Sequence, residues 1–226
     1  MPKRTFDMPL APPIAKEIEA LLKKRYSERA STEDQKIVEG VQNFIVHVQR
    51  RRSAHNLLQE AARTIHRVFP FQEITIGIKN PDDGLYRYDT FIGYTHEAEE
   101  EFKKHTYTLK EFFDPSEFPS IRICKLIDVT IAENEPAMEK ELACWNRPLE
   151  TNVPRKSPDE FTEGDYMDVL VYSEDNEMVA WMELSNPRDG KMPSASTLKG
   201  LELFSAVMSL ALQSLVPKEK DIPAKR

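Results

Sequence analysis

Two acidic residues, Asp168 and Glu183, have the types and the spacing from which a binding site can be built. They belong to segments 166–173 and 177–185, in which apolar residues alternate with other residues as they do in strands. A two-residue turn at 175–176 between these segments places Asp168 directly opposite Glu183. The same predicted face carries Asp168, Leu170, Tyr172, Val179, Trp181 and Glu183. Aromatic rings beside two carboxylates are typical of a pocket floor rather than of a core.

The two opposed carboxylates need a cation, a proton or water. Like charges directly opposite each other on a sheet repel, so burial favours the neutral form of at least one carboxyl unless a cation lies between them. Arg122 or the ligand itself can supply that cation. The alternative is that Asp168 and Glu183 lie at an open edge of the sheet, where water screens their repulsion and no function follows.

Two residues outside this hairpin are further candidates for the pocket. Trp145 lies in segment 133–164, a proline-containing stretch typical of a loop that covers a pocket. Its ring either closes over a ligand or anchors the loop to the core. Cys124, in a strand predicted over 120–127, can line the pocket as a small apolar residue, and no residue near it in sequence would lower the pKa of its thiol.

The elements that must position these residues follow from the apolar pattern. Helical spacing predicts helices over 14–26, 31–48 and 53–69, and a closing helix over 194–215 that is apolar on nearly all sides. Alternating isoleucines predict an earlier hairpin over 73–92. The second face of the 166–185 hairpin is wholly apolar and is expected to pack on helices; it comprises Met167, Val169, Val171, Ala180, Met182 and Leu184.

Several classes of site have no motif in this chain. The five histidines lack the paired spacing of a metal site, and there is neither a glycine-rich phosphate loop nor a Gly-x-Ser-x-Gly turn. We therefore expect no metal and no catalytic residue. Three arginines, 50–52, suit the negative end of a helix dipole, and they lack the aromatic companions of a nucleic-acid site, so no nucleic-acid partner is expected.

Composition indicates an intracellular protein. The net charge of −7 is unevenly spread: residues 1–70 carry 13 Lys and Arg against 8 Asp and Glu, and the remainder carries 18 against 30. No apolar run approaches the roughly 18 residues of a membrane span, and the first residues do not read as a secretory leader. We expect a cytoplasmic location, no membrane partner and two reduced cysteines.

Two passages resemble the GAF family. Segment 166–184, with Tyr172-Ser173 before the turn, is similar to the last hairpin of a GAF domain, and 185–204 is similar to the connection and closing helix. The resemblance covers about 53–216. It implies an α+β fold with an antiparallel sheet of about five or six strands, the N-terminal and C-terminal helices on one face, and loops and short helices over a pocket on the other. The expected division is a tail and short amphipathic helix (1–30), a helical linker for dimerisation (31–52), the GAF-like domain (53–216) and a tail (217–226).

The resemblance also implies a function class. GAF domains are commonly non-catalytic sensory modules that bind small molecules and form homodimers through their terminal helices, so we expect a small-molecule ligand and a separate downstream signalling protein. The ligand and any cofactor are left unknown. Asn186 is followed by Pro187 where cyclic-nucleotide-binding members have Asn-Lys, neither Cys124 nor Cys144 has the setting of a bilin-binding cysteine, and no histidine is placed as a haem ligand.

Two other functions stay open. One GAF branch reduces free methionine sulfoxide with loop cysteines, which here would require Cys124 and Cys144 to lie within bonding range. The other is a scaffold whose pocket takes no ligand and whose function is dimerisation through its helices. The apolar stripe over 37–48 and the closing helix predict a dimer, or else packing of the N-terminal helices on the closing helix within one chain.

Overall fold

A computed structural model describes residues 13–27, 33–48, 53–134, 142–148, 150 and 153–215 of the chain. The basic run 50–52 and most of the two predicted tails lie outside these ranges. Within them the chain forms one antiparallel sheet in the order β3-β2-β1-β7-β6-β5-β4. Its strands are β1 (Phe71–Lys79), β2 (Tyr86–Ile92), β3 (Thr106–Tyr107), β4 (Ile121–Arg122), β5 (Ile127–Thr130), β6 (Tyr166–Tyr172) and β7 (Met178–Pro187).

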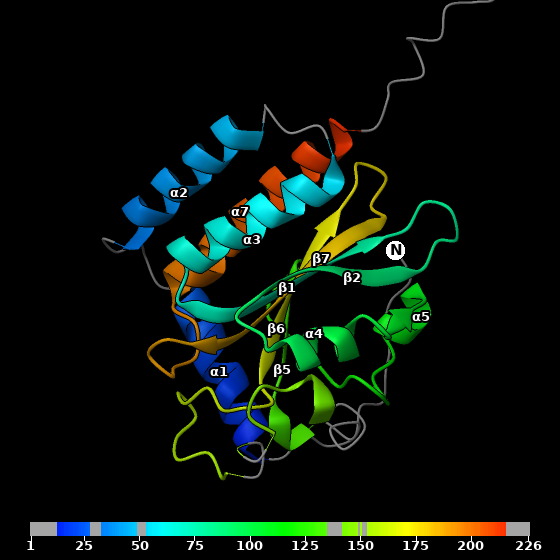
Figure 1. Cartoon of the computed structure of the whole chain (residues 1–226). Coiled ribbons are helices and arrows are strands. Elements are labelled where there is room, and N and C mark those ends of the chain that lie inside the picture. The colour runs from blue at the N-terminus through cyan, green and yellow to red at the C-terminus, as the bar shows by residue number, and fades with distance from the viewer. Residues whose placement is uncertain are drawn as a thin grey trace, which may run out of the picture.

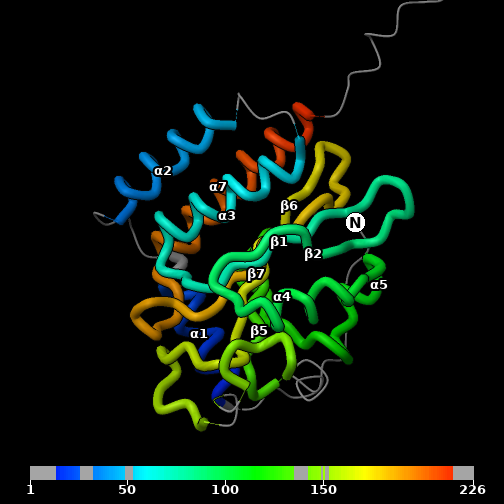
Figure 2. Tube along the Cα trace, in the orientation of Figure 1, coloured from blue at the N-terminus to red at the C-terminus, as the bar shows by residue number. Residues whose placement is uncertain are grey.

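Long helices and short helices lie on opposite sides of this sheet (Figure 1). The long ones are α1 (Pro13–Ser27), α2 (Glu33–Val48), α3 (Ala54–Val68) and α7 (Ala195–Gln213). The short ones are α4 (His96–Phe102), α5 (Leu109–Phe112) and the 3₁₀ turns η1 (Ala132–Asn134) and η2 (Leu142–Cys144). The trace in Figure 2 shows α2, α3 and α7 running side by side over β1, β6 and β7. The predicted α+β arrangement is confirmed, with seven strands in the described part of the chain instead of five or six.

The helix side of the sheet holds the main core. All six residues of the predicted apolar face, from Met167 to Leu184, are buried there. The rings of Phe44 on α2 and Phe204 on α7 lie 4.7 Å apart between their centroids. By length and composition α7 is the one described helix that could cross a membrane, and 56% of it is buried inside the chain, as in a core helix. Because α1 and α2 pack on α7, the N-terminal helices are seated within the chain.

The β6–β7 turn is longer than the predicted two-residue turn. The Ser173 N–H donates to the Glu177 carbonyl at 2.8 Å, and Asn176 adopts a φ of 59°. One residue is therefore extra on β7. Tyr172 pairs with Met178, and Val179 is a bulge that packs toward the helix-side core, so the prediction that Val179 faces the pocket is wrong. Beyond the bulge the predicted register is confirmed.

The 3₁₀ turn η1 and the segment before β6 are joined by a buried ion pair. The Arg155 guanidinium donates to Asp165 Oδ1 at 2.7 Å and to Glu133 Oε2 at 2.8 Å. The side chains of Arg155 and Asp165 are 1% and 0% exposed. Asp165 also accepts the backbone N–H groups of Ala132 and Thr162. These bonds fix the path of the covering segment next to the first residue of β6.

We expect Arg155→Met to lower the free energy of unfolding by about 3–5 kcal/mol, because it leaves the buried Asp165 carboxylate without its cation. Urea unfolding followed by circular dichroism measures this. Arg87→Met is the matched control, since Arg87 pairs with Asp83 in water and should cost little. Equal effects of the two substitutions would contradict the structural role given to Arg155.

Candidate functional site

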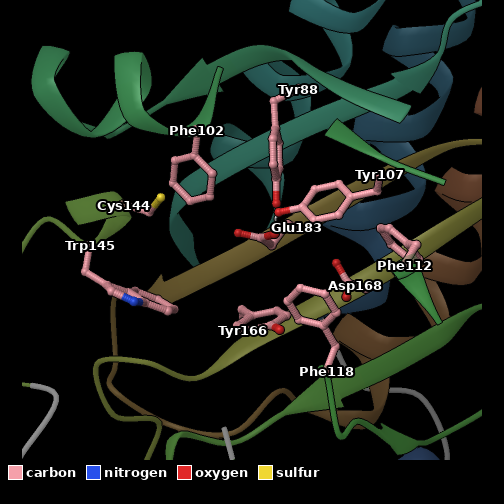
Figure 3. A pocket seen from close by; sticks show the side chains of 10 residues that line it. All are labelled: Tyr88, Phe102, Tyr107, Phe112, Phe118, Cys144, Trp145, Tyr166, Asp168 and Glu183. Atoms are coloured by element: carbon pink, nitrogen blue, oxygen red, sulfur yellow. Dashed lines mark hydrogen bonds between the residues drawn. The ribbon is translucent and has the colours of Figure 1, made fainter. Parts of the chain in front are cut away.

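A small cavity lies on the side of the sheet opposite α7 (Figure 3). Its volume is about 40 Å³, enough for roughly three water molecules or a very small ligand group. It is lined by Tyr88, Phe102, Tyr107, Phe112, Phe118, Cys144, Trp145, Tyr166, Asp168 and Glu183. Figure 3 shows the carboxyl groups of Asp168 and Glu183 set among these rings. The cavity is therefore mainly aromatic with an acidic floor.

The two carboxylates of the floor come from neighbouring strands. Asp168 on β6 pairs in register with Glu183 on β7, as the sequence predicts. The Tyr88 hydroxyl donates to Glu183 Oε2 at 2.9 Å. Glu183 is buried and Asp168 is half-buried, so neither lies at the open edge that the sequence alternative required. The strand order places them in the middle of the sheet.

Asp168 and Glu183 belong to a row of polar side chains that crosses five strands. Consecutive register partners along this row are Arg122 on β4, Asp128 on β5, Asp168, Glu183 and then Thr75 on β1. Arg122 binds Asp128 through Nε and through Nη2, the latter at 2.7 Å from Oδ2. The row thus contains three acidic residues and one basic residue, and the basic residue serves the acid at the sheet edge.

More buried acids lie beside this row. The Ser185 hydroxyl donates to Glu73 Oε2 at 3.1 Å, and the Asn186 amide donates to Glu73 Oε1 at 2.8 Å. Burial raises the pKa of Tyr94 well above its ordinary value, and the carboxylates of Glu183 and Glu73 raise it further. This side of the sheet therefore buries several carboxyl groups near one another.

Glu163 is a further buried carboxyl near the same interior, and it carries its own cation. Burial and the nearby Glu73 raise the pKa of Glu163, while the Arg147 side chain, which donates to it, opposes that rise. Arg147 belongs to the loop that includes Trp145. The contact therefore links the covering loop to the acidic interior.

Trp181 packs beneath the cavity against two of the rings that line it. Its ring lies 5.0 Å from Tyr88 and 5.1 Å from Phe112, both in edge-to-face geometry. The ring covers Gly77 on β1: a Cβ at that position would stand 1.9 Å from Trp181 Cη2. Only a glycine at this position leaves room for the indole beside β1. Leu170, its register partner on β6, is buried in the same cluster.

Trp145 forms the wall of the cavity on the loop side. Trp145 is 8% exposed, and its indole N–H has no hydrogen-bond partner among the described residues. The next residue, Asn146, accepts the Thr95 N–H at 2.9 Å and donates to the Gly93 carbonyl at 2.8 Å. These bonds dock the loop on the β2–α4 connection and hold the ring over the cavity.

The nine predicted site residues fall into four groups. Asp168, Glu183 and Trp145 line the cavity, and Leu170, Tyr172 and Trp181 belong to the aromatic cluster beneath and beside it. Arg122 lines an adjoining surface groove of about 520 Å³ that also reaches Asp168. Val179 and Cys124 pack against the helix-side core instead. Cys124 differs from the prediction because segment 120–127 is not one strand: β4 ends at Arg122, and residues 123–126 form a tight turn into β5.

The two cysteines lie on opposite sides of the sheet. Burial raises the pKa of the Cys124 thiol to about 11, with a hydrogen bond to Glu202 of α7 adding to the effect. Cys144 lines the cavity, with its Sγ 3.7 Å from His105 Nε2. Neither cysteine forms a disulfide. The reductase alternative requires two thiols at one pocket mouth. The fold therefore does not bring Cys124 and Cys144 together as that alternative requires.

Sequence reasoning missed most of the aromatic wall. Tyr88, Phe102, Tyr107, Phe112 and Phe118 come from β2, α4, β3, α5 and the segment after it. The one signal available was the density of aromatic residues over 102–118 in a stretch too short for a hydrophobic core of its own. Among the described residues, no group of three or more His, Cys, Asp or Glu side chains is arranged to hold a metal ion.

No protein-family model and no curated protein matches the sequence. Solved structures match the fold. The GAF domain of an Acinetobacter phosphoenolpyruvate-protein phosphotransferase is 12% identical, with a TM-score of 0.50 over 78% of this chain and 92% of that one. Free methionine-R-sulfoxide reductase from Neisseria meningitidis is 9% identical, with a TM-score of 0.53 over 83% and 94%.

A third match is the chromophore-binding domain of an unusual bacteriophytochrome from R. palustris. It is 12% identical, with a TM-score of 0.50 over 83% of this chain and 64% of that chain. At such identities the likeness concerns the fold alone. The chain has a GAF-like fold.

We expect Gly77→Ala to destabilise the protein by about 1–3 kcal/mol, because the added methyl group displaces the Trp181 ring from a packed site. Chemical unfolding followed by tryptophan fluorescence measures both the loss and the change in ring environment. In a Trp181→Leu background the same substitution should cost clearly less. An unchanged cost in that background would show that the indole is not the obstacle.

Proposed function

We propose that this chain is a small-molecule-binding regulatory module that works as a homodimer and passes its signal to a separate cytoplasmic protein. The observation that carries the proposal is the aromatic cavity with an acidic floor on the side of the sheet away from the long helices. Buried carboxylates are costly in a core and are common in binding sites, where a ligand compensates for them. Catalysis is not part of the proposal.

The structural neighbours support ligand binding at such a fold. The bacteriophytochrome domain is described as chromophore-binding, and the reductase structure contains its substrate. The cavity of this chain is much smaller than a tetrapyrrole or a nucleotide requires, since known ligand pockets span about 300–1,000 Å³. A ligand of this chain is therefore a small molecule, or one whose small group enters the cavity while the rest lies in the adjoining groove.

Dimerisation is supported by an apolar stripe on the outer side of the helix layer. Val38 and Ile45 of α2, and Leu203 and Leu210 of α7, are each seven residues apart and are exposed. The N-terminal ends of the two helices lie side by side, because the hydroxyl of Ser194, before α7, donates to Glu33 at the start of α2. Val38 and Leu203 also border one shallow groove. A second copy packed on this stripe would bury all four side chains in a helix bundle.

Ligand binding is tested on protein that has been unfolded and refolded to remove any bound molecule. Fractions of small metabolites should raise the unfolding temperature of the wild type, because a ligand that binds only the folded state stabilises it. The two tryptophans of the chain, Trp145 and Trp181, should report the event by fluorescence. Cys144→Met fills part of the cavity and should reduce the shift. No shift with any fraction, or equal shifts in both proteins, would overturn the proposal.

Dimerisation is tested by light scattering during size-exclusion chromatography. The wild type should have the mass of two chains, and the double variant Ile45→Glu/Leu203→Glu should have the mass of one, because each charge would be buried at the interface. Asn43→Glu is the control, since residue 43 is exposed on the other flank of α2. A monomeric wild type would remove this part of the proposal and leave ligand binding standing.

A further inference from the structure

The cavity walls have the chemistry of a cation site. Aromatic rings attract a positive charge over their faces, and seven of the ten lining residues are aromatic. The remaining polar groups on the wall include two carboxylates, Asp168 and Glu183, and their oxygens act as acceptors when ionised. Such a lining disfavours an anion, because the ring faces and the carboxylates both carry negative charge. It favours a compact cation that can contact both.

The register of the sheet adds a second reason. Asp128, Asp168 and Glu183 are consecutive partners in one row, and like charges directly opposite each other destabilise a sheet. Arg122 binds Asp128 at the edge of the sheet. A positive group in the cavity would lie against the other two acids, on the face to which both carboxyl groups point (Figure 3). Ligand binding would then reduce the repulsion within the row.

Trp145 supplies an independent observation that points to the ligand. Its indole N–H is buried at the cavity wall and has no hydrogen-bond partner among the described residues. A buried N–H of this kind is costly unless an acceptor is present. The acceptor that fits is an oxygen atom of the ligand, because the carboxylates are already needed for the charge. The ligand therefore combines a cationic group with a hydroxyl or carbonyl oxygen.

Size restricts the cation further. A volume of about 40 Å³ holds a group of a few non-hydrogen atoms when each water-sized atom takes on the order of 10–15 Å³. A metal ion is a poor candidate, because within the described ranges no three His, Cys, Asp or Glu side chains converge. Larger parts of a ligand have a place nearby: Phe112, Phe118 and Asp168 line both the cavity and the adjoining groove.

We propose that the cavity binds a small protonated amine that carries an oxygen acceptor, with the ammonium group between Asp168 and Glu183 and the oxygen on the Trp145 N–H. This inference rests on the proposed function, and it names the ligand class of that same site. Tyr88 orients Glu183 through its hydroxyl group.

Four probes of similar size test the proposal. Ethanolamine carries the cation and the oxygen, ethylammonium carries the cation alone, ethylene glycol is neutral and glycolate is an anion. The spectrum of the ¹⁵N-labelled full chain contains two indole N–H signals, because there are two tryptophans. At constant ionic strength ethanolamine should shift the Trp145 signal most, ethylammonium should bind more weakly, and the neutral and anionic probes should leave both signals unchanged.

Three substitutions locate the contacts. Asp168→Asn and Glu183→Gln should each weaken ethanolamine binding at least tenfold, because they remove charge with little change in shape. Trp145→Phe should keep ethylammonium binding, followed by the Trp181 signal, and should abolish the advantage of ethanolamine. Asp175→Asn in the exposed β6–β7 turn is the control and should bind like the wild type. Circular dichroism identifies any variant that fails to fold. The role of the charge is then decided by whichever of Asp168→Asn and Glu183→Gln folds like the wild type.

The outcomes separate this inference from the proposed function. If glycolate or ethylene glycol shifts the indole signals as strongly as the amines, the amine proposal is wrong and small-molecule binding stands. The amine proposal is also wrong, and small-molecule binding also stands, if no probe binds but a metabolite fraction raises the unfolding temperature. If neither the probes nor any fraction binds the refolded wild type, both proposals fall. Equal binding by Glu183→Gln and the wild type also overturns the amine proposal.

Discussion

The burial of negative charge on one side of the sheet is the constraint on which the rest of this structure depends. Three adjacent strands, β5, β6 and β7, each contribute a carboxylate to the same row. An apolar helix cannot cover such a row, because it offers no groups that neutralise or hydrogen-bond the acids. The long helices therefore pack on the other side, where the same strands present apolar residues only. The acidic side is left to short helices and loops.

Those loops contribute the polar groups that a helix could not. Arg147 reaches Glu163 and Arg155 reaches Asp165, both acids lying just before β6. The contacts have different consequences. The pair of Arg155 and Asp165 is closed to water and fixes the loop path, whereas Arg147 is exposed and joins the Trp145 segment to the sheet. The cavity remains between these anchors and the aromatic side chains of β2, α4 and α5.

The centre of the site could be predicted from the sequence, and its walls could not. Six apolar residues that must share one face allow a single register for β6 and β7, and that register places Asp168 opposite Glu183. The bulge at Val179 escaped prediction because Asp175-Asn176 suits a two-residue turn as well as the longer turn that forms. Phe102 and Phe118 reach the cavity through tertiary packing of segments far apart in the chain, and no local periodicity encodes that meeting.

Helix α7 is the element that joins the acidic side of the sheet to the outer surface of the molecule. The Ser205 hydroxyl donates to the Leu170 carbonyl, and the Ser209 hydroxyl donates to the Tyr172 carbonyl, so two turns of α7 are bonded to the strand that carries Asp168. Leu203 and Leu210, on the same turns, form part of the exposed apolar stripe. A displacement of β6 must therefore either move α7 or break buried hydrogen bonds. Because broken buried bonds are costly, movement of α7 is the favoured response. In the proposed dimer, the same helix would carry a displacement of β6 to the surface on which the second chain packs.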